Sequence, residues 1–139
     1  MVAMGAALIA RVGPLTCAIP IEHVIETMRP LPVEPIGTGA AYVLGVAIIR
    51  GAPTLAVSLA KLLEVVGEAP TRFVVVRSGD RRVAFAVDAV VEVRDIAATD
   101  RLPPLIRADA IRAIAAADRE LVVVLEAARA IAPEVWSAL

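Results

Sequence analysis

The chain has 139 residues, 59% of them hydrophobic, and a formal net charge of −1, so it can bury a core of its own and lacks the cationic surface that nucleic-acid binding needs. Aromatic residues make up only 3%, which also argues against a surface that stacks the bases of single strands. Cys17 is the only cysteine and His23 the only histidine, so an intrachain disulfide and a Cys/His metal site are excluded.

The high hydrophobic content does not indicate a membrane span. The longest uncharged run covers the fifteen residues 35–49 and contains one proline and three glycines, which is too short and too broken for a spanning helix. No basic stretch precedes the first apolar run, so we expect no signal peptide. We predict a cytoplasmic protein without direct membrane insertion, whose surplus apolar side chains serve the core and a surface for partners.

The first third of the chain alternates short apolar runs with turn residues. Strands are expected over 7–12 and 15–21, on either side of a turn at Gly13-Pro14, and a further strand over 23–28. Residues 29–39 hold three prolines and two glycines and are expected to form a loop.

A hairpin and a short helix are expected next. The apolar runs 42–49 and 53–57 meet at Arg50-Gly51-Ala52, a pattern typical of a β-hairpin. The helix is predicted from Ser58 as N-cap to Gly67 as C′, because its apolar residues recur at helical spacing. Those residues are Leu59, Leu62, Leu63 and Val66.

The second half repeats this plan. Strands are expected over 73–77 and 82–87 around Ser78-Gly79-Asp80, then over 90–93, followed by a loop around 102–104. Two more strands, 110–116 and 121–125, flank Asp118-Arg119, and a second short helix is expected over 127–131, before Pro133. Many short strands separated by turns at regular intervals indicate a mostly β fold of small barrels.

The two halves are related by a constant offset of 66 residues, since 79 − 13 = 66 for the glycines that open the matching segments Gly13–Glu26 and Gly79–Glu92. Extending this offset places Ile48 on Ile114, Leu55 on Leu121 and Val57 on Val123. A fixed offset suggests a duplicated unit. We predict one domain with a first barrel over 7–67 and a second over 71–132, possible strand exchange between them, and a groove between the two lobes.

Candidate catalytic groups are few. The repeat matches Glu22 with Asp88 and Glu26 with Glu92, so an acid/base pair is conceivable, but no motif of a carboxylate protease accompanies them. Solvated or interface carboxylates are the favoured interpretation. Ser58-x-x-Lys61 has the spacing of a serine nucleophile and its lysine, yet the companion motifs are absent and Ser58 is already assigned as a cap. We therefore predict no enzyme, no cofactor and no metal.

Arg50-Gly51 stands out because a charge interrupts the most apolar region of the chain at a turn. Gly51 can supply the positive φ that such a turn often requires, where another residue would cost about 1–2 kcal/mol. Arg50 is either a solvated turn residue or an anchor presented to a partner, since arginine is enriched among residues that dominate interfaces.

The sequence around this turn resembles the CheW-like chemotaxis coupling proteins. Gly45-Val46-Ala47-Ile48-Ile49-Arg50-Gly51 followed by Leu55-Ala56-Val57-Ser58-Leu59 is similar to the family pattern G-V-x-N-x-R-G … P-V-x-D-L. Segments similar to other family motifs extend the resemblance over nearly the whole chain, in order: Ile19–Glu26, Val87–Val93 and Leu121–Glu126.

The resemblance implies two SH3-like five-stranded barrels with a few short helices. It also implies a non-enzymatic cytoplasmic adaptor that joins the tips of chemoreceptors to the regulatory domain of the histidine kinase CheA. Arg50 and Glu26 match the family's partner-contact positions, and we add their neighbours Gly51, Val24 and Ile49 to the expected protein-binding residues. Gly45 matches a structural glycine of the family, and Gly79 is expected to serve the turn of the second half.

Five positions depart from the family pattern. The departures favour a diverged system, for example one that governs surface motility, and the sequence does not name the receptor, the kinase or the oligomeric state. The positions are Ile48, Leu55, Ser58, Ala84 and Ala113.

The adaptor hypothesis assigns the groove between the lobes to a receptor helix, with Arg50 and Glu26 setting its orientation. The alternative from another class is a small β-barrel protein that binds an apolar ligand in a pocket. Hydrolysis by the repeat-related carboxylates Glu22 and Asp88 is a more distant third.

Overall fold

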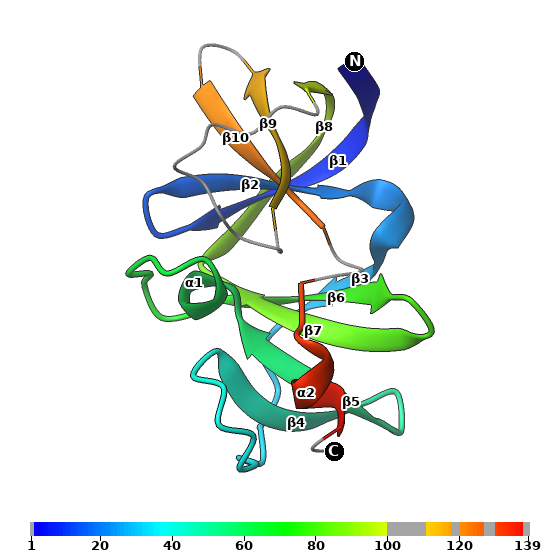
Figure 1. Cartoon of the computed structure of the whole chain (residues 1–139), viewed down its shortest axis with the longest axis vertical. Helices are drawn as coiled ribbons and strands as arrows, with labels where there is room; N and C mark the ends of the chain where they lie inside the picture. Colours follow the sequence, from blue (N-terminus) through cyan, green and yellow to red (C-terminus); the bar gives the residue numbers. More distant parts are fainter. Residues whose placement is uncertain (1, 100–110, 118–119, 127–129, 138–139) are drawn as a thin grey trace.

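A computed structural model describes residues 2–99, 111–117, 120–126 and 130–137. The chain is mostly β, as predicted, and consists of two five-stranded sheets stacked along the long axis of the molecule with a few short helices (Figure 1). The elements in chain order are β1 (Val2–Val12), β2 (Leu15–Pro20), the 3₁₀ turn η1 (Ile21–His23), β3 (Val24–Met28), β4 (Val43–Ile49), β5 (Ala52–Ser58), α1 (Leu59–Leu62), β6 (Arg72–Ser78), β7 (Arg81–Val87), β8 (Ala89–Thr99), β9 (Ile111–Ala117), β10 (Glu120–Leu125) and α2 (Pro133–Ser137).

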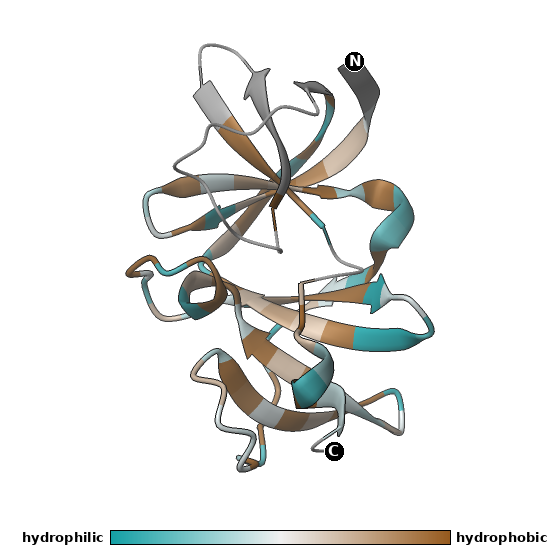
Figure 2. Cartoon of the chain, in the orientation of Figure 1, coloured by the Kyte–Doolittle hydropathy of each residue, from teal (hydrophilic) through white to brown (hydrophobic). Residues whose placement is uncertain are grey.

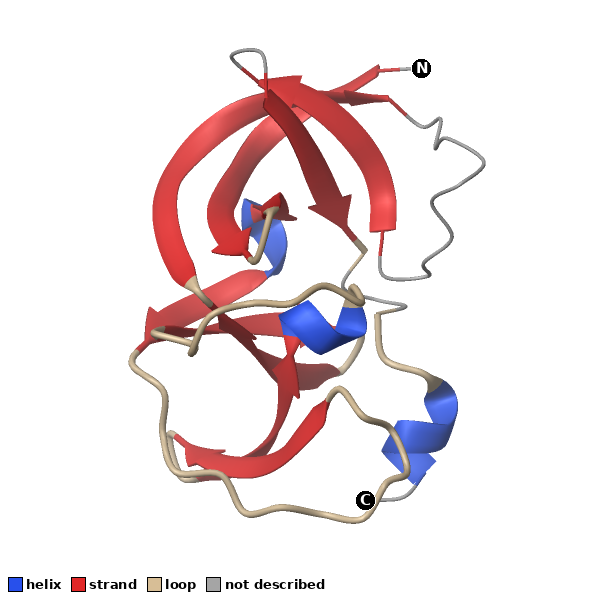
Figure 3. Ribbon diagram, turned by 90° about the vertical axis from the view of Figure 1, so that its left-hand side faces the viewer, coloured by secondary structure: helices blue, strands red, loops and turns tan. Residues whose placement is uncertain are grey.

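The two sheets differ in closure. The first sheet has the strand order β1-β2-β10-β9-β8, and β8 pairs again with β1, so these five strands close into a barrel (Figure 3). The second sheet has the order β3-β6-β7-β5-β4. Each sheet contains one parallel pair, β2 with β10 and β5 with β7, among antiparallel ones.

The sheets do not divide the chain at the boundary between the predicted halves. The first sheet combines β1 and β2 from the half 7–67 with β8, β9 and β10 from the half 71–132. The second sheet combines β3, β4 and β5 with β6 and β7. Strands are therefore exchanged between the halves, so neither sheet can form from one half alone.

The predicted duplication is visible in the strand pairing. In the second sheet Glu26 lies opposite Val75, and in the first sheet Glu92 lies opposite Ile9. Glu92 lies 66 residues after Glu26, and Val75 lies 66 residues after Ile9, so the two pairs are related by the predicted offset. The bulges agree too, because the register skips Ile25 in β3 and its repeat mate Val91 in β8.

The offset changes farther along the chain, which corrects part of the sequence alignment. Val43 pairs with Val57 in the second sheet, and Ile111 pairs with Leu125 in the first, so the offset here is 111 − 43 = 68. Leu55 therefore corresponds to Val123 and Val57 to Leu125, in place of the predicted Leu121 and Val123. The two extra residues of the second half lie between Arg94 and Ile111, since 43 − 28 = 15 and 111 − 94 = 17.

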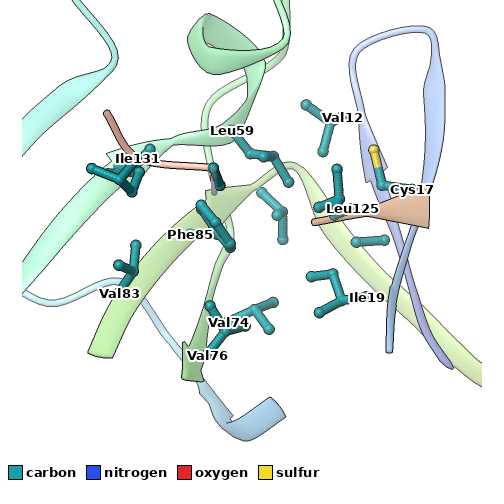
Figure 4. Close-up of a cluster of buried hydrophobic side chains, with 14 of the residues drawn as sticks. Val12, Cys17, Ile19, Leu59, Val74, Val76, Val83, Phe85, Leu125 and Ile131 are labelled. Carbon is teal, nitrogen blue, oxygen red and sulfur yellow. The ribbon is translucent and has the colours of Figure 1, made fainter. Parts of the chain in front are cut away.

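The hydrophobic core has three layers. One cluster belongs to the first sheet alone and another to the second sheet with its loop, while the largest lies between the sheets (Figure 4). Apolar residues run along the strands that face this layer, as Figure 2 shows for β7. Figure 4 labels the side chains that meet there from both sheets, among them Val12, Cys17, Ile19, Val74, Val76, Val83, Phe85 and Leu125.

This middle layer limits where a groove between the lobes could lie. Its buried members are 0–8% exposed, because the two sheets pack directly on each other. Side chains that are buried against the other sheet cannot also cover a receptor helix. A groove between the lobes would have to use the partly buried apolar residues around this layer, and it stays a prediction.

Both short helices differ from their predicted extents. Ser58 is the N-cap of α1, as expected, since its hydroxyl accepts the Lys61 N–H at 3.2 Å. The helix ends at Leu62, however, and Glu64 takes the left-handed φ of 58° that was assigned to Gly67. Val66 is consequently 92% exposed instead of lying on a buried helix face.

The predicted second helix lies partly outside the described residues, at 127–129, and Ala130 and Ile131 are not helical. The helix α2 begins at Pro133, because proline needs no N–H partner in the first turn. Ala130, Ile131 and Val135 are buried in the middle layer, and the Ala132 N–H donates to the Tyr42 hydroxyl at 3.3 Å. The C-terminal segment therefore leaves the first sheet and packs on the second.

Candidate functional site

The β4–β5 hairpin carries the candidate site. Ile49 and Ala52 form its last register pair, so Arg50 and Gly51 are a two-residue turn. Both have left-handed backbones, with φ of 54° and 77°, which is the pattern of a type I′ turn. The predicted hairpin and the positive φ of Gly51 are thus confirmed. Arg50 shares this conformation although it has a Cβ, at a cost of about 1–2 kcal/mol.

Arg50 reaches from this turn to Glu26 on β3 and makes a bidentate ion pair. Its Nη2 donates to Glu26 Oε1 at 2.9 Å and its Nε to Oε2 at 3.2 Å. The Arg50 side chain is 73% exposed and that of Glu26 only 23%. The hydrogen bond from Arg50 lowers the pKa of the Glu26 carboxyl, and the same bond raises the pKa of Arg50. The pair thus fixes an arginine on the surface above a partly covered carboxylate.

Two further residues near this pair were not selected from the sequence as binding residues. Ile48 precedes the turn by two positions and is 62% exposed, so a large apolar side chain stands beside the charged turn. Arg82 on β7 also lowers the pKa of Glu26 through its charge. Strict alternation along β4 could have indicated Ile48, because Ile49 faces the opposite side.

The other expected binding residues are placed differently. Ile49 is 4% exposed and belongs to the core cluster of the second sheet, so its side chain supports the hairpin from below. Val24 is partly buried against the cluster between the sheets. Neither side chain is an exposed contact. Ile49 is adjacent to Arg50, and alternation along β4 turns it inward. Val24 is two residues from Glu26, but the bulge at Ile25 interrupts the alternation that would place both on one face.

Both structural glycines have a backbone reason for being glycine. Gly45 has a φ of 143°, and a Cβ there would overlap the carbonyl of Glu34, whose backbone pairs with Val46. Gly79 has a φ of 63° in the two-residue turn between Ser78 and Arg81. Gly45 thereby lets the proline-rich loop lie against β4.

Asp88 and Glu92, two of the repeat-related carboxylates, make contacts within the fold. Asp88 Oδ2 accepts the backbone N–H groups of Gly13 at 2.8 Å and Glu68 at 3.1 Å, which ties the β1–β2 turn to the loop after α1. Glu92 pairs with Arg94 at 2.6 Å on its own strand, which lowers its pKa. Glu22 lies in η1 and is exposed. These environments favour the structural interpretation that the sequence suggested.

The remaining candidates for chemistry are a capping serine and a buried thiol. Ser58 Oγ is occupied by its capping bond. Cys17 is fully buried, and burial raises the pKa of its thiol to about 12, so the nucleophilic thiolate is suppressed.

The described part of the chain contains no cluster of three His, Cys, Asp or Glu side chains that could hold a metal ion. Among the described residues, no helix has the length and apolarity needed to cross a membrane.

The fold and the site define a duplicated, mostly β domain that presents an arginine–glutamate pair at a hairpin. The model of the CheW-like domain family matches residues 6–134, and the chain belongs to that family. This confirms the resemblance found in the sequence. The CheW family is a family of non-catalytic chemotaxis scaffold proteins.

A solved structure has the same fold. The chain is similar to the crystal structure of the scaffolding protein TtCheW from Thermoanaerobacter tengcongensis, with a TM-score of 0.78 and 18% sequence identity. The similarity covers 89% of this chain and 85% of that one. No curated protein matches the chain by sequence.

Proposed function

We propose that the chain is a cytoplasmic adaptor that couples the tips of chemoreceptors to the regulatory domain of a CheA-type histidine kinase, in a chemotaxis or chemotaxis-like pathway. Its membership in the CheW-like family supports this function. An SH3-like architecture for each five-stranded sheet is part of the same proposal, and so is the absence of enzymatic activity.

The observation that carries the proposal is the exposed Arg50 on a turn that costs conformational free energy. A strained turn persists where the surrounding structure holds it, and such turns gather at functional sites. Here Glu26 fixes the guanidinium in a defined place while 73% of the arginine side chain remains open to a partner. An arginine that is already ordered loses less entropy on binding than a mobile one.

The binding surface consists of Arg50, Gly51, Glu26 and the exposed Ile48. The arginine and the glutamate set the orientation of the partner and exclude wrong charges, while Ile48 supplies apolar area. The family pattern has an asparagine where this chain has Ile48, so the partner is expected to present an apolar contact at this position. This substitution favours a diverged receptor or kinase.

The test is co-precipitation with a chemoreceptor and a CheA-type kinase from the same organism, with Arg50→Asp as the first variant. A second variant exchanges the two charges, Glu26→Arg with Arg50→Glu, which keeps an ion pair but reverses the surface. We expect both variants to lose binding, because the partner contacts the arginine itself. Restored binding by the exchanged pair would show that Arg50 only positions the hairpin.

The matched control is Arg94→Asp, which breaks the exposed pair with Glu92 on the first sheet. It is expected to keep binding. Circular dichroism and thermal unfolding of each variant show whether the fold is intact. Undiminished binding by a folded Arg50→Asp variant would remove Arg50 from the interface and leave the proposal without its main support.

A further inference from the structure

A second surface feature lies beside the hairpin, on the outside of the second sheet. An open groove of about 480 Å³ lies between β5 and β7 and is bordered by Trp136 of α2. In Figure 1 the helix α2 crosses in front of these two strands. Its lining combines four residues of β5, the β6–β7 turn with the first two residues of β7, and the C-terminal helix. The lining residues are Ala52, Pro53, Thr54, Leu55, Asp80, Arg81, Arg82 and Trp136.

Strand pairing explains why a groove forms here. The parallel ladder between β5 and β7 includes Leu55 opposite Val83 but no earlier pair. Before that point, residues 52–54 pair only with β4, and residues 81–82 pair only with β6. The two strands part at this end of the sheet, and the groove occupies the place where their ladder would continue.

One wall of the groove presents an oriented cation. The Arg81 guanidinium stacks on the Trp136 ring at 4.7 Å from its centroid. Stacking uses the face of the guanidinium and leaves its in-plane N–H donors available for a carboxylate. No carboxylate lies within ion-pairing distance of Arg81 in the part of the chain that the structure describes.

The charges around the groove are unbalanced. The charged residues of its lining are Arg81, Arg82 and Asp80, which carry a net charge of +1, from two arginines and one aspartate. The charge of Arg82 also acts on Glu26. Strand alternation places Arg81 and Arg82 on opposite faces of β7, so Arg81 is the cation that a carboxylate bound beside Trp136 would meet first.

The groove also has an apolar border. Ile48 lies directly opposite Pro53, so both side chains are on the same face of the β4–β5 pair. Ile48 is 62% exposed, and Pro53 lines the groove together with Trp136. A cationic groove with an apolar border is complementary to an extended peptide that carries both carboxylates and an apolar side chain.

We propose that this groove binds an acidic segment of a partner protein, with a carboxylate on Arg81 and an apolar side chain against Ile48, Pro53 and Trp136. The proposal does not depend on the partner being a receptor or a kinase. It assigns a binding role to the C-terminal helix, which supplies the ring that orders Arg81. A groove lined by both polar and apolar residues also fits a peptide better than the apolar ligand of the alternative function.

The test uses Trp136 as its reporter, because it is the only tryptophan in the chain. The full chain is titrated at low salt with a ten-residue peptide of glutamates around a central leucine, and with a matched peptide of lysines. We expect a saturable change in tryptophan fluorescence with the acidic peptide only. Anisotropy of the labelled peptide gives an affinity that does not depend on the tryptophan signal.

Arg81→Gln is expected to weaken binding of the acidic peptide about tenfold, because the variant loses one charge-assisted hydrogen bond to a carboxylate of the peptide. Arg82→Gln provides a second variant in case the first does not fold. The matched control is Arg29→Gln, which removes the same charge from an exposed position of the proline-rich loop and should leave the affinity unchanged. Added salt should weaken binding by the native chain.

Three results would overturn the proposal. The first is no saturable response of the native chain to millimolar acidic peptide. The second is an equal loss of affinity in Arg29→Gln and Arg81→Gln, which would indicate a response to net charge alone. The third is tighter binding of inorganic phosphate or of a short oligonucleotide, each titrated separately, than of the acidic peptide, which would assign the groove to another class of ligand.

Discussion

Arg50 Nη2 lies 2.9 Å from Glu26 Oε1, although 24 residues separate the two in sequence. Glu26 lies on β3 and Arg50 on the β4–β5 turn, so the pair connects the two ends of the pairing order β3-β6-β7-β5-β4. The pair therefore joins two strands that are not hydrogen-bonded to each other. A contact between the two ends of the pairing order requires the second sheet to curl, since a flat sheet would hold its outer strands apart.

The first prediction concerns the pKa of Glu26. The hydrogen bond and charge of Arg50 lower this pKa, so Arg50→Gln should raise it toward the ordinary value of a glutamate. The pKa of Glu26 is lower in the folded chain than in the unfolded chain, so the ion pair stabilises the fold at pH values above the unfolded-state pKa. This stabilisation is lost as the pH falls through the folded-state pKa. Carboxyl-resolved NMR titration of the native chain and the variant measures the change.

The control for this titration is Arg94→Gln. Arg94 lowers the pKa of Glu92 in the same way, so this variant should raise the pKa of Glu92 and leave that of Glu26 in place. A Glu26 pKa that is the same in the native chain and in Arg50→Gln would contradict the ion pair.

The second prediction concerns Gly45. Gly45→Ala should lower the free energy of unfolding by about 2–4 kcal/mol, because the added Cβ meets the Glu34 backbone and the φ of 143° is unfavourable for alanine. Urea denaturation measures this change. Gly37→Ala is the matched control, since a Cβ at Gly37 has open space around it. Equal stability of the two variants would mean that the loop does not lie against β4.

The third prediction concerns Asp88. Its carboxylate satisfies two backbone N–H groups of different loops, so Asp88→Ala should destabilise the fold by about 1–3 kcal/mol through unpaired donors. Thermal and urea unfolding measure the effect. Asp80→Ala removes an equal charge from the exposed β6–β7 turn and should change stability much less. A neutral Asp88→Ala result would contradict this bridging role.

The fourth prediction concerns the single thiol. Burial raises the Cys17 pKa from 9.0 to about 12. An aromatic disulfide reagent at pH 8 should therefore modify Cys17 in the native chain only at the rate at which local unfolding exposes the thiol. Because the folded pKa is the higher one, this group's contribution to stability is present below pH 9 and is lost as pH rises toward 12. Rapid labelling without denaturant would contradict the burial.

The pKa shift has a separate check, because Cys17→Ala removes the titrating group. The slope of stability against pH between 9 and 11 should be smaller in this variant than in the native chain. Identical slopes would mean that the thiol has the same pKa in the folded and unfolded chains.

Much of the secondary structure could be predicted from local patterns. Gly13, Gly51 and Gly79 mark three hairpin turns, and each adopts a positive φ there. Local patterns failed at the end of α1, where Glu64 instead of Gly67 takes the left-handed conformation. Gly67 is small for a tertiary reason, because a Cβ there would lie 2.8 Å from Asp88 Oδ1. A glycine needed for packing looks the same in sequence as a glycine needed for a cap.

The candidate site was predicted in part. Arg50 and Glu26 were both selected, on family resemblance, but nothing in their spacing indicates that they pair. Ile49 was selected and is buried, whereas Ile48 was named only as a departure from the family and is exposed. Arg81 and Trp136 were not selected, because the groove that joins them exists only where β5 and β7 part.

The amino-acid sequence by itself determined the mostly β class, the duplication, the turn positions and the family. Each of these depends on residue types at short spacing, or on a pattern that is repeated in order along the chain. Only the tertiary structure decided that strands are exchanged between the halves, that the space between the sheets is filled, and which side of each strand is open to a partner. These features depend on contacts between distant residues, and a strand's sequence is compatible with several neighbours until packing selects one.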